Sequence, residues 1–156
     1  MPGVTMTPIG TVRSTRTATV DDRWDAVVSS IELDPVQFTP EALAALDTFS
    51  HVEVVYLFDR VDPATVEKGA RHPRNNTAWP KVGIFAQRGK NRPNRIGTTI
   101  CHVDRIEGLR VHVTGLDAVE GTPVLDIKPW VREFGPRGEV RQPEWMVELM
   151  RAYWCD

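Results

Sequence analysis

Short apolar stretches, rich in β-branched and aromatic residues, alternate with polar turns along most of the chain. This pattern favours β-strands, which we expect at residues 7–15, 26–33, 51–61, 82–86, 97–106, 109–116 and 124–130. The stretch HVEVVYLFDRV at 51–61 has apolar residues in both alternation phases, which predicts a strand covered on both faces. The stretches on either side of Glu107-Gly108 are predicted to pair as a hairpin, because the returning segment alternates apolar and polar residues.

Two segments are predicted to be helical. Thr39 is an N-cap candidate before Pro40, which predicts one short helix over ALAALDTF. The segment RQPEWMVELMRAYW, 141–154, places apolar residues at helical spacing and predicts a terminal helix with a large apolar load. This terminal helix either packs on the chain's own strands or docks on a second subunit.

The expected elements define the fold class. Six or seven strands with one short internal helix predict a mainly β protein, a small single-sheet β-barrel with a C-terminal helix, because a layered α/β fold needs a helix after each strand. The 156 residues suit one domain. We expect the barrel at 1–140 and a helical tail of the same domain at 141–156.

Composition excludes several classes of protein. The two cysteines are too few for a disulfide framework or a four-ligand zinc site, and we expect both to stay thiols in a reducing compartment. None of the four histidines has a cysteine or carboxylate at metal-ligand spacing, so no metal is expected. No apolar run approaches the roughly 18 residues of a membrane span, and the N-terminus lacks the layout of a signal peptide. These features predict a cytoplasmic protein without a membrane partner.

Charge is segregated along the chain. The net charge is −2, yet residues 69–103 contain seven lysines and arginines and no acidic residue, which gives this segment +7 and leaves −9 for the rest. Such a field steers anions toward one face of a protein. The segment is therefore either a surface for an anionic partner or a solvated loop.

The segment GIFAQRGKNRPNRIG, 83–97, is the first candidate for chemistry. It forms a turn dense in Gly, Asn and Pro that carries Arg88, Arg92 and Arg95. Guanidinium groups bind carboxylates and phosphates with two parallel hydrogen bonds, and the amide of Asn94 can both donate and accept. An anionic or nucleotide-like ligand is predicted here, with a purely structural turn as the alternative.

The segment GLDAVEGTPVLDIKPW, 115–130, is the second candidate. It places Asp117, Glu120, Asp126 and Lys128 among aliphatic residues. Buried carboxylates need partners, so we expect them to contact the arginines of the first segment or a cationic ligand, or to form ion pairs that only tie strands together. The chain lacks the glycine-rich nucleotide motifs, His-Glu-x-x-His and Gly-x-Ser-x-Gly, which removes the mechanisms that depend on them.

Together these two segments resemble the signature of the TsaA-like (TrmO) family of S-adenosylmethionine-dependent methyltransferases. That signature runs Gly-x-Phe-Ala-x-Arg, Arg-Pro-Asn-x-Ile-Gly, and Asp-Gly-Thr-Pro-Val-x-Asp-Ile-Lys-Pro. The similarity extends to IGTVRS at 9–14 and FSHVEVVYLFD at 49–59, and so to nearly the whole chain. It implies a small β-barrel that binds S-adenosylmethionine and acts as a homodimer. It also implies a tRNA substrate, N6-methylated on the threonylcarbamoyl-modified adenosine at position 37.

The resemblance further implies where the cofactor binds. The expected positions, all within these motifs or at the end of the strand before them, are Asp59, Arg60, Arg88, Thr98, Glu120, Gly121, Thr122 and Pro123. Three residues depart from the family pattern: Glu120 replaces Asp, Asp59 stands where the tRNA enzymes often have His, and Arg95 replaces a second Pro. A carboxylate at position 59 or 120 can still bind the ribose hydroxyls or the ammonium group of the cofactor, with altered geometry.

Methyl transfer from a sulfonium mainly requires that donor and acceptor are held in line. An exocyclic adenine nitrogen also needs an acceptor for its proton, for which Asp126 and Asn94 are the candidates, with Lys128 as electrostatic support. The leading interpretation is a tRNA methyltransferase. A methyltransferase with a small-molecule acceptor, and a non-catalytic module that binds S-adenosylmethionine or RNA, are the alternatives. The enzymatic interpretation needs the arginine-bearing turn and the Gly-Thr-Pro turn to lie close together, within one subunit or across two.

Overall fold

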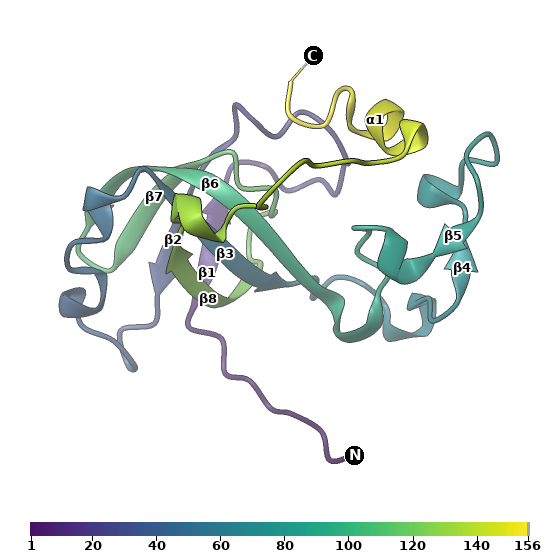
Figure 1. Cartoon of the computed structure of the whole chain (residues 1–156). Coiled ribbons are helices and arrows are strands. Elements are labelled where there is room, and N and C mark those ends of the chain that lie inside the picture. Colours follow the sequence, from purple (N-terminus) through teal and green to yellow (C-terminus); the bar gives the residue numbers. More distant parts are fainter. Residues whose placement is uncertain (156) are drawn as a thin grey trace.

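Six antiparallel strands close into a barrel in the order β1–β2–β7–β6–β3–β8 (Figure 1). The computed structural model describes residues 1–155. The barrel strands are β1 (Gly10–Ser14), β2 (Val28–Leu33), β3 (His51–Leu57), β6 (Ile96–Glu107), β7 (Arg110–Thr114) and β8 (Pro123–Pro129). The predicted mainly β fold with a single closed sheet is confirmed.

The core lies inside the barrel and is built by alternation along each strand. Val52, Val54 and Tyr56 of β3 point inward and are at most 2% exposed, and Val111 and Val113 of β7 are fully buried. Burying each such side chain contributes roughly 1.5–3 kcal/mol relative to leaving it in water.

The prediction that the 51–61 strand is covered on both faces is wrong in part. Val55 and Leu57, on the outer face of β3, are only half-buried. A single closed sheet has one interior, so the second face of each strand meets solvent or loops instead of a second layer.

The β6–β7 hairpin confirms the predicted turn at Glu107-Gly108. Glu107 pairs with Arg110, and Gly108 has a φ of +58°, a left-handed conformation that glycine adopts without strain. The register shifts between Val103 and Arg105, where a bulge helps a long strand to bend around the barrel.

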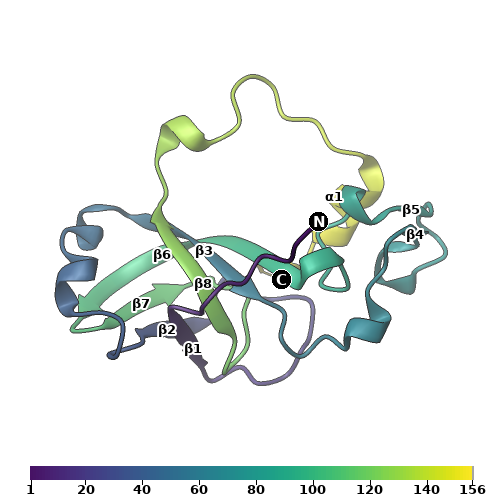
Figure 2. The same cartoon turned by 90° about the horizontal axis from the view of Figure 1, so that it is seen from below.

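An extension, residues 62–95, stands apart from the barrel in both views (Figures 1 and 2). Its elements are short: the 3₁₀ turns η3 (Pro63–Thr65), η4 (Pro73–Asn75), η5 (Ile84–Ala86) and η6 (Pro93–Arg95), and the paired strands β4 (Ala70–Arg71) and β5 (Val82–Gly83).

The strand predicted at 82–86 therefore ends at Gly83 and does not belong to the barrel. The side chain of Gln87 explains the early end. Its Nε2 donates to the carbonyls of Arg71 at 3.1 Å and Val82 at 2.9 Å, so a side chain closes the turn where a strand ladder would continue.

The short helix predicted after Thr39 is replaced by two 3₁₀ turns, η1 (Pro40–Leu43) and η2 (Leu46–Thr48). Between them Ala45 has a φ of +66°, which breaks the helical path. Another 3₁₀ turn, η7 (Arg132–Phe134), follows the last barrel strand.

The C-terminal helix is present but shorter than predicted, α1 (Glu144–Met150). After it the chain returns to its own barrel. The backbone N–H groups of Arg23, Trp24 and Asp25 donate to the carbonyls of Ala152, Tyr153 and Trp154 at 3.0, 2.9 and 2.8 Å. Of the two predicted destinations for this segment, the structure shows packing on the same chain.

A pair of glycines tests the packing of the barrel. A methyl group on Gly97 would lie 2.6 Å from Cε2 of Tyr56 and 2.7 Å from Cζ of Phe58, whereas at Gly83 nothing lies within 4 Å. We expect Gly97→Ala to lower the free energy of unfolding by about 2 kcal/mol and Gly83→Ala to change it little. Urea unfolding measures both. Equal midpoints for the two variants would contradict the packing described.

Candidate functional site

The turns of both motif segments lie at one end of the barrel. Because all neighbouring strands are antiparallel, β1, β3 and β7 finish at this end while β2, β6 and β8 begin there. The loops 15–27, 58–95 and 115–122 therefore leave the barrel on the same side, which we call the loop end. The fold thus brings together segments that are distant in sequence.

The Glu120 turn closes the barrel at the loop end. Glu120 accepts from the backbone N–H of Ser14 at 2.6 Å and from Nη1 of Arg13 at 3.0 Å. These contacts, with the Ser14 N–H foremost, lower the pKa of Glu120. Gly121 has a φ of +84°, and Thr122 donates its hydroxyl to the carbonyl of Val119 at 2.7 Å. The carboxylate expected to meet a ligand is used here to cap β1.

The segment 58–61 connects the two motifs. Arg60 donates to the carbonyls of Thr17 at 3.0 Å and Glu120 at 2.9 Å. On the other side, the backbone carbonyl of Arg95 accepts from the N–H of Phe58 at 2.8 Å, and the Arg95 guanidinium donates to the carbonyl of Val61 at 2.9 Å. The arginine-bearing turn and the Gly-Thr-Pro turn are therefore bonded to the same short segment.

The three arginines of the first motif divide into two kinds. Two of them donate to backbone carbonyls in or beside the loop, Arg92 to that of Gln87 at 2.6 Å and Arg95 to that of Val61. Arg88 is exposed and reaches back to the barrel, where its Nη2 donates to the carbonyl of Thr98 at 3.1 Å and contacts the Thr98 hydroxyl oxygen at 3.4 Å.

Thr98 lies on the outer face of the barrel beside the second motif. Across neighbouring strands Thr98 pairs with Val55, and Val55 pairs with Asp126. With strands roughly 4.8 Å apart, Thr98 and Asp126 stand about 10 Å apart on one face. Lys128 donates to Asp126 at 2.6 Å, and this bond raises the pKa of Lys128. We call Arg88, Thr98, Asp126 and Lys128 the outer-face site.

Asn94 and Asp59 do not belong to this group of bonded and paired residues. Asn94 is exposed in η6 with a φ of +62°, and Asp59 is exposed directly after β3. Among the hydrogen bonds of residues 1–155, none joins either side chain to the outer-face site.

Asp117 has partners that the sequence did not indicate. The Tyr56 hydroxyl donates to its Oδ1 at 2.8 Å, and the hydroxyls of Thr99 and Tyr153 also donate to this carboxylate. Burial, together with the nearby carboxylate, raises the pKa of both tyrosines. The expectation that this carboxylate meets an arginine of the loop is wrong. Alternation along the strand places Tyr56 on the inner face, but nothing in the sequence links Asp117 to Tyr56 or to Tyr153.

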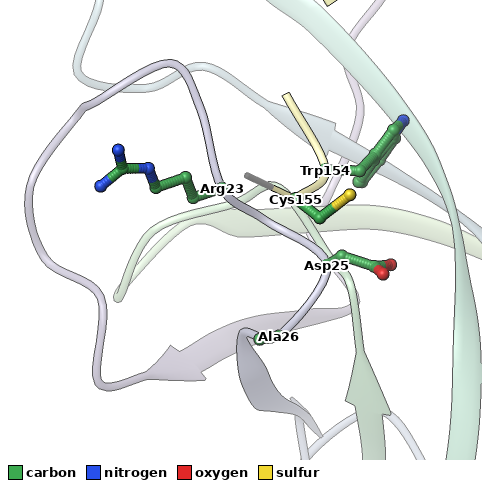
Figure 3. A pocket seen from close by; sticks show the side chains of 5 residues that line it. All are labelled: Arg23, Asp25, Ala26, Trp154 and Cys155. Carbon is green, nitrogen blue, oxygen red and sulfur yellow. The ribbon is translucent and has the colours of Figure 1, made fainter. Parts of the chain in front are cut away.

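Two shallow hollows also open at the loop end. One, of about 370 Å³, lies between the 23–26 segment and the tail and is lined by Arg23, Asp25, Ala26, Trp154 and Cys155 (Figure 3). The other, of about 510 Å³, includes Glu120 and His112. Neither of these two hollows includes a residue of the outer-face site, where Arg88 and Lys128 are exposed.

The remaining candidates for chemistry have structural surroundings. Cys101 is 2% exposed, and burial raises the pKa of its thiol to about 12, so the thiol stays neutral. Within residues 1–155, no group of three or more His, Cys, Asp or Glu side chains is placed to hold a metal ion. Over the same residues, every helix is too short or too polar to cross a membrane.

Fold and site define a class of protein, a closed six-stranded barrel with an inserted cationic extension. One arginine of the extension reaches the outer face of a barrel strand, and that face also carries Asp126 and Lys128. The family model described as the tRNA-methyltransferase O N-terminal domain matches residues 17–135. The chain belongs to this family, as the motif resemblance indicated.

Similar proteins span this chain to different extents. The chain is 36% identical over 102 residues to the human tRNA (adenine(37)-N6)-methyltransferase, a match that covers 65% of this chain and 23% of the human protein. It is 35% identical over 139 residues to a probable S-adenosyl-L-methionine-binding protein of Methanothermobacter thermautotrophicus, covering 84% of this chain and 93% of that protein. A crystal structure of TrmO from Pseudomonas aeruginosa superposes with a TM-score of 0.72 and 30% identity, over 90% of this chain and 62% of that one. The chain spans less than a quarter of the mammalian relatives.

The lowered pKa of Glu120 predicts a pH-dependent contribution to stability. A depressed carboxyl pKa stabilises the folded state above the ordinary value of 4.5, and this contribution is lost as pH falls through the depressed pKa. We expect Glu120→Gln to have a lower Tm than the parent at pH 7, with the difference closing on acidification. The exposed Glu41→Gln is the control. A Tm difference for Glu120→Gln that is independent of pH would contradict this account.

Proposed function

We propose that the chain is an S-adenosylmethionine-dependent methyltransferase that acts on N6 of an adenosine in tRNA. The supporting observation is that Arg88, from one motif, is bonded to Thr98 on the strand face that also carries Asp126 and Lys128, from the other. The relatives' names agree with this chemistry. The proposal includes the threonylcarbamoyl-modified adenosine at position 37 as the acceptor.

The residues of the outer-face site fit the polar groups of S-adenosylmethionine. This cofactor presents a carboxylate, an ammonium group and ribose hydroxyls. Arg88 is exposed, and the contacts of its guanidinium within residues 1–155 use Nη2 alone, so further N–H donors are available for a carboxylate. Asp126, whose side chain is 47% exposed, can accept from hydroxyl or ammonium groups, as can the exposed Asp59.

Other expected cofactor residues have a supporting part in this proposal. The guanidinium of Arg60 is already hydrogen-bonded to two neighbouring loops, and the carboxylate of Glu120 is already hydrogen-bonded to β1. We assign them, with the turn 121–123, to shaping the edge of the cofactor site. Bound S-adenosylmethionine supplies an activated methyl group on a sulfonium, so the chain has to orient the acceptor and accept its proton.

Asp126 is the group that takes the proton of the amine to which the methyl group is transferred. Its Oδ1 accepts from the N–H of Ile127 at 2.9 Å, and its Oδ2 accepts from Lys128 at 2.6 Å, so the carboxylate is held in one orientation. Lys128 is therefore a positioning residue for Asp126. Asn94, an exposed amide on the neighbouring loop, can donate to or accept from the same base.

Methyl transfer to a nucleotide is tested with purified chain, S-adenosylmethionine and bulk tRNA, with mass spectrometry of the nucleosides. We expect a methylated adenosine, and at least tenfold weaker cofactor binding in Arg88→Ala, because charge-assisted hydrogen bonds are lost. Arg105→Ala, at the opposite end of β6, is the control and should behave like the parent. Cofactor binding without any methylated nucleoside would contradict the proposal, and undetectable tRNA binding at physiological salt would favour a small-molecule acceptor.

We also propose that the protein is a homodimer. Arg88 and Lys128 of the outer-face site are exposed on one chain, and Ile100, two residues from Thr98 on the same face, is 47% exposed. A second copy over this face would exclude water from the site. Light scattering at micromolar concentration should give twice the chain mass of 17.6 kDa, with Ile100→Glu shifted toward the monomer. A monomeric parent would contradict this prediction.

The proposal also covers where the protein is located, in the cytoplasm, and how its chain is divided, into one domain. Both cysteines are free thiols, which agrees with a reducing compartment, and a tRNA substrate places the chain in the cytoplasm. The backbone hydrogen bonds of 23–25 with 152–154 support treating the tail, 141–156, as part of the same domain as the barrel at 1–140.

A further inference from the structure

Phe85 is an exposed aromatic residue on a fixed turn. Its side chain is 79% exposed, although both Ile84 before it and Gln87 after it are buried. The N–H of Ile84 donates to the carbonyl of Gly69 at 2.9 Å, and Gln87 donates to two carbonyls of the extension. The turn therefore holds the ring outward on an ordered backbone.

The surroundings of Phe85 are cationic. Lys81, Arg88 and Lys90 lie within a few residues of it, and the segment 69–103 contains no acidic residue. Within residues 1–155, Arg74 is the one Lys or Arg of that segment that forms an ion pair, with Asp21 and Asp22. The charges near Phe85 thus remain available to an anionic partner.

Phe85 also lies next to the outer-face site. Arg88 is three positions after Phe85, so the two Cα atoms are at most about 11 Å apart. Arg88 is bonded to Thr98, on the same strand face as Asp126. A molecule that contacts Phe85 can therefore extend directly to the site.

We propose that Phe85 is a stacking platform for an unpaired nucleotide of bound RNA, adjacent to the base that enters the outer-face site. This inference rests on the proposed function. Exposed aromatic rings bordered by Lys and Arg bind single-stranded nucleic acid, since the ring stacks on a base while the cations contact phosphates.

The test uses fluorescence anisotropy with two labelled RNAs, a tRNA anticodon stem-loop and a fully paired hairpin of equal length. We expect Phe85→Ala to weaken stem-loop binding roughly tenfold without changing the salt dependence of affinity, because stacking releases no counterions. Phe85→Trp should restore the affinity. Lys81→Ala should instead weaken binding of both RNAs and reduce the slope of log affinity against log salt by roughly 0.7–0.9. Circular dichroism establishes that each variant is folded.

Several outcomes would overturn the inference. If the Phe85→Ala variant binds the stem-loop with the affinity of the parent, Phe85 is not a stacking platform, and the proposed function is unaffected. Loss of S-adenosylmethionine affinity in the absence of RNA would make Phe85 a cofactor contact, and a reduced mass by light scattering would make it a contact between copies. A parent chain that binds neither RNA would overturn the tRNA proposal itself, and this inference with it.

Discussion

The pairing of β1 with β8 is the constraint on which the other features depend. Gly10 pairs with Val124 and Thr11 with Pro123, and Val12 exchanges backbone hydrogen bonds with Gly121 and Thr122. Glu120, whose carboxylate binds the end of β1, strengthens this junction. A Cβ on Gly10 would lie 2.3 Å from the carbonyl oxygen of Glu32, so the close approach of β1 to β2 requires glycine here. This junction closes the barrel, and along its other edge β8 pairs with β3, which places Asp126 beside Val55 on the outer face.

Much of the positive charge in the first motif is structural. Arg92 and Arg95 donate to carbonyls within or beside their own loop, and Arg60 links two other loops in the same way. Guanidinium groups suit this task because their forked donors satisfy carbonyls that no strand pairs. The result is an ordered loop that leaves Arg88 exposed at the surface. Charge counted from sequence therefore overestimates what a ligand meets.

The barrel was predictable because strand alternation is a local property. Val111 and Val113 are buried as their phase indicated, and the turn at Gly108 is where the pattern placed it. The extension was not predictable, since β5 ends when the side chain of Gln87 binds two carbonyls. The motifs located Arg88, Thr98 and Asp126 near one another. They did not indicate that Asp117 would bind Tyr153, because that contact depends on where the tail returns.

The return of the tail sets an order on assembly. Residues 23–25 bond to 152–154, so this early segment waits for a segment that is synthesised much later. Until then Asp117 lacks the Tyr153 hydroxyl. Contacts this distant in sequence slow folding, because a long loop must close before they form. During synthesis the barrel strands, the last of which ends at Pro129, can therefore form before residues 152–154 add the cover over the loop end.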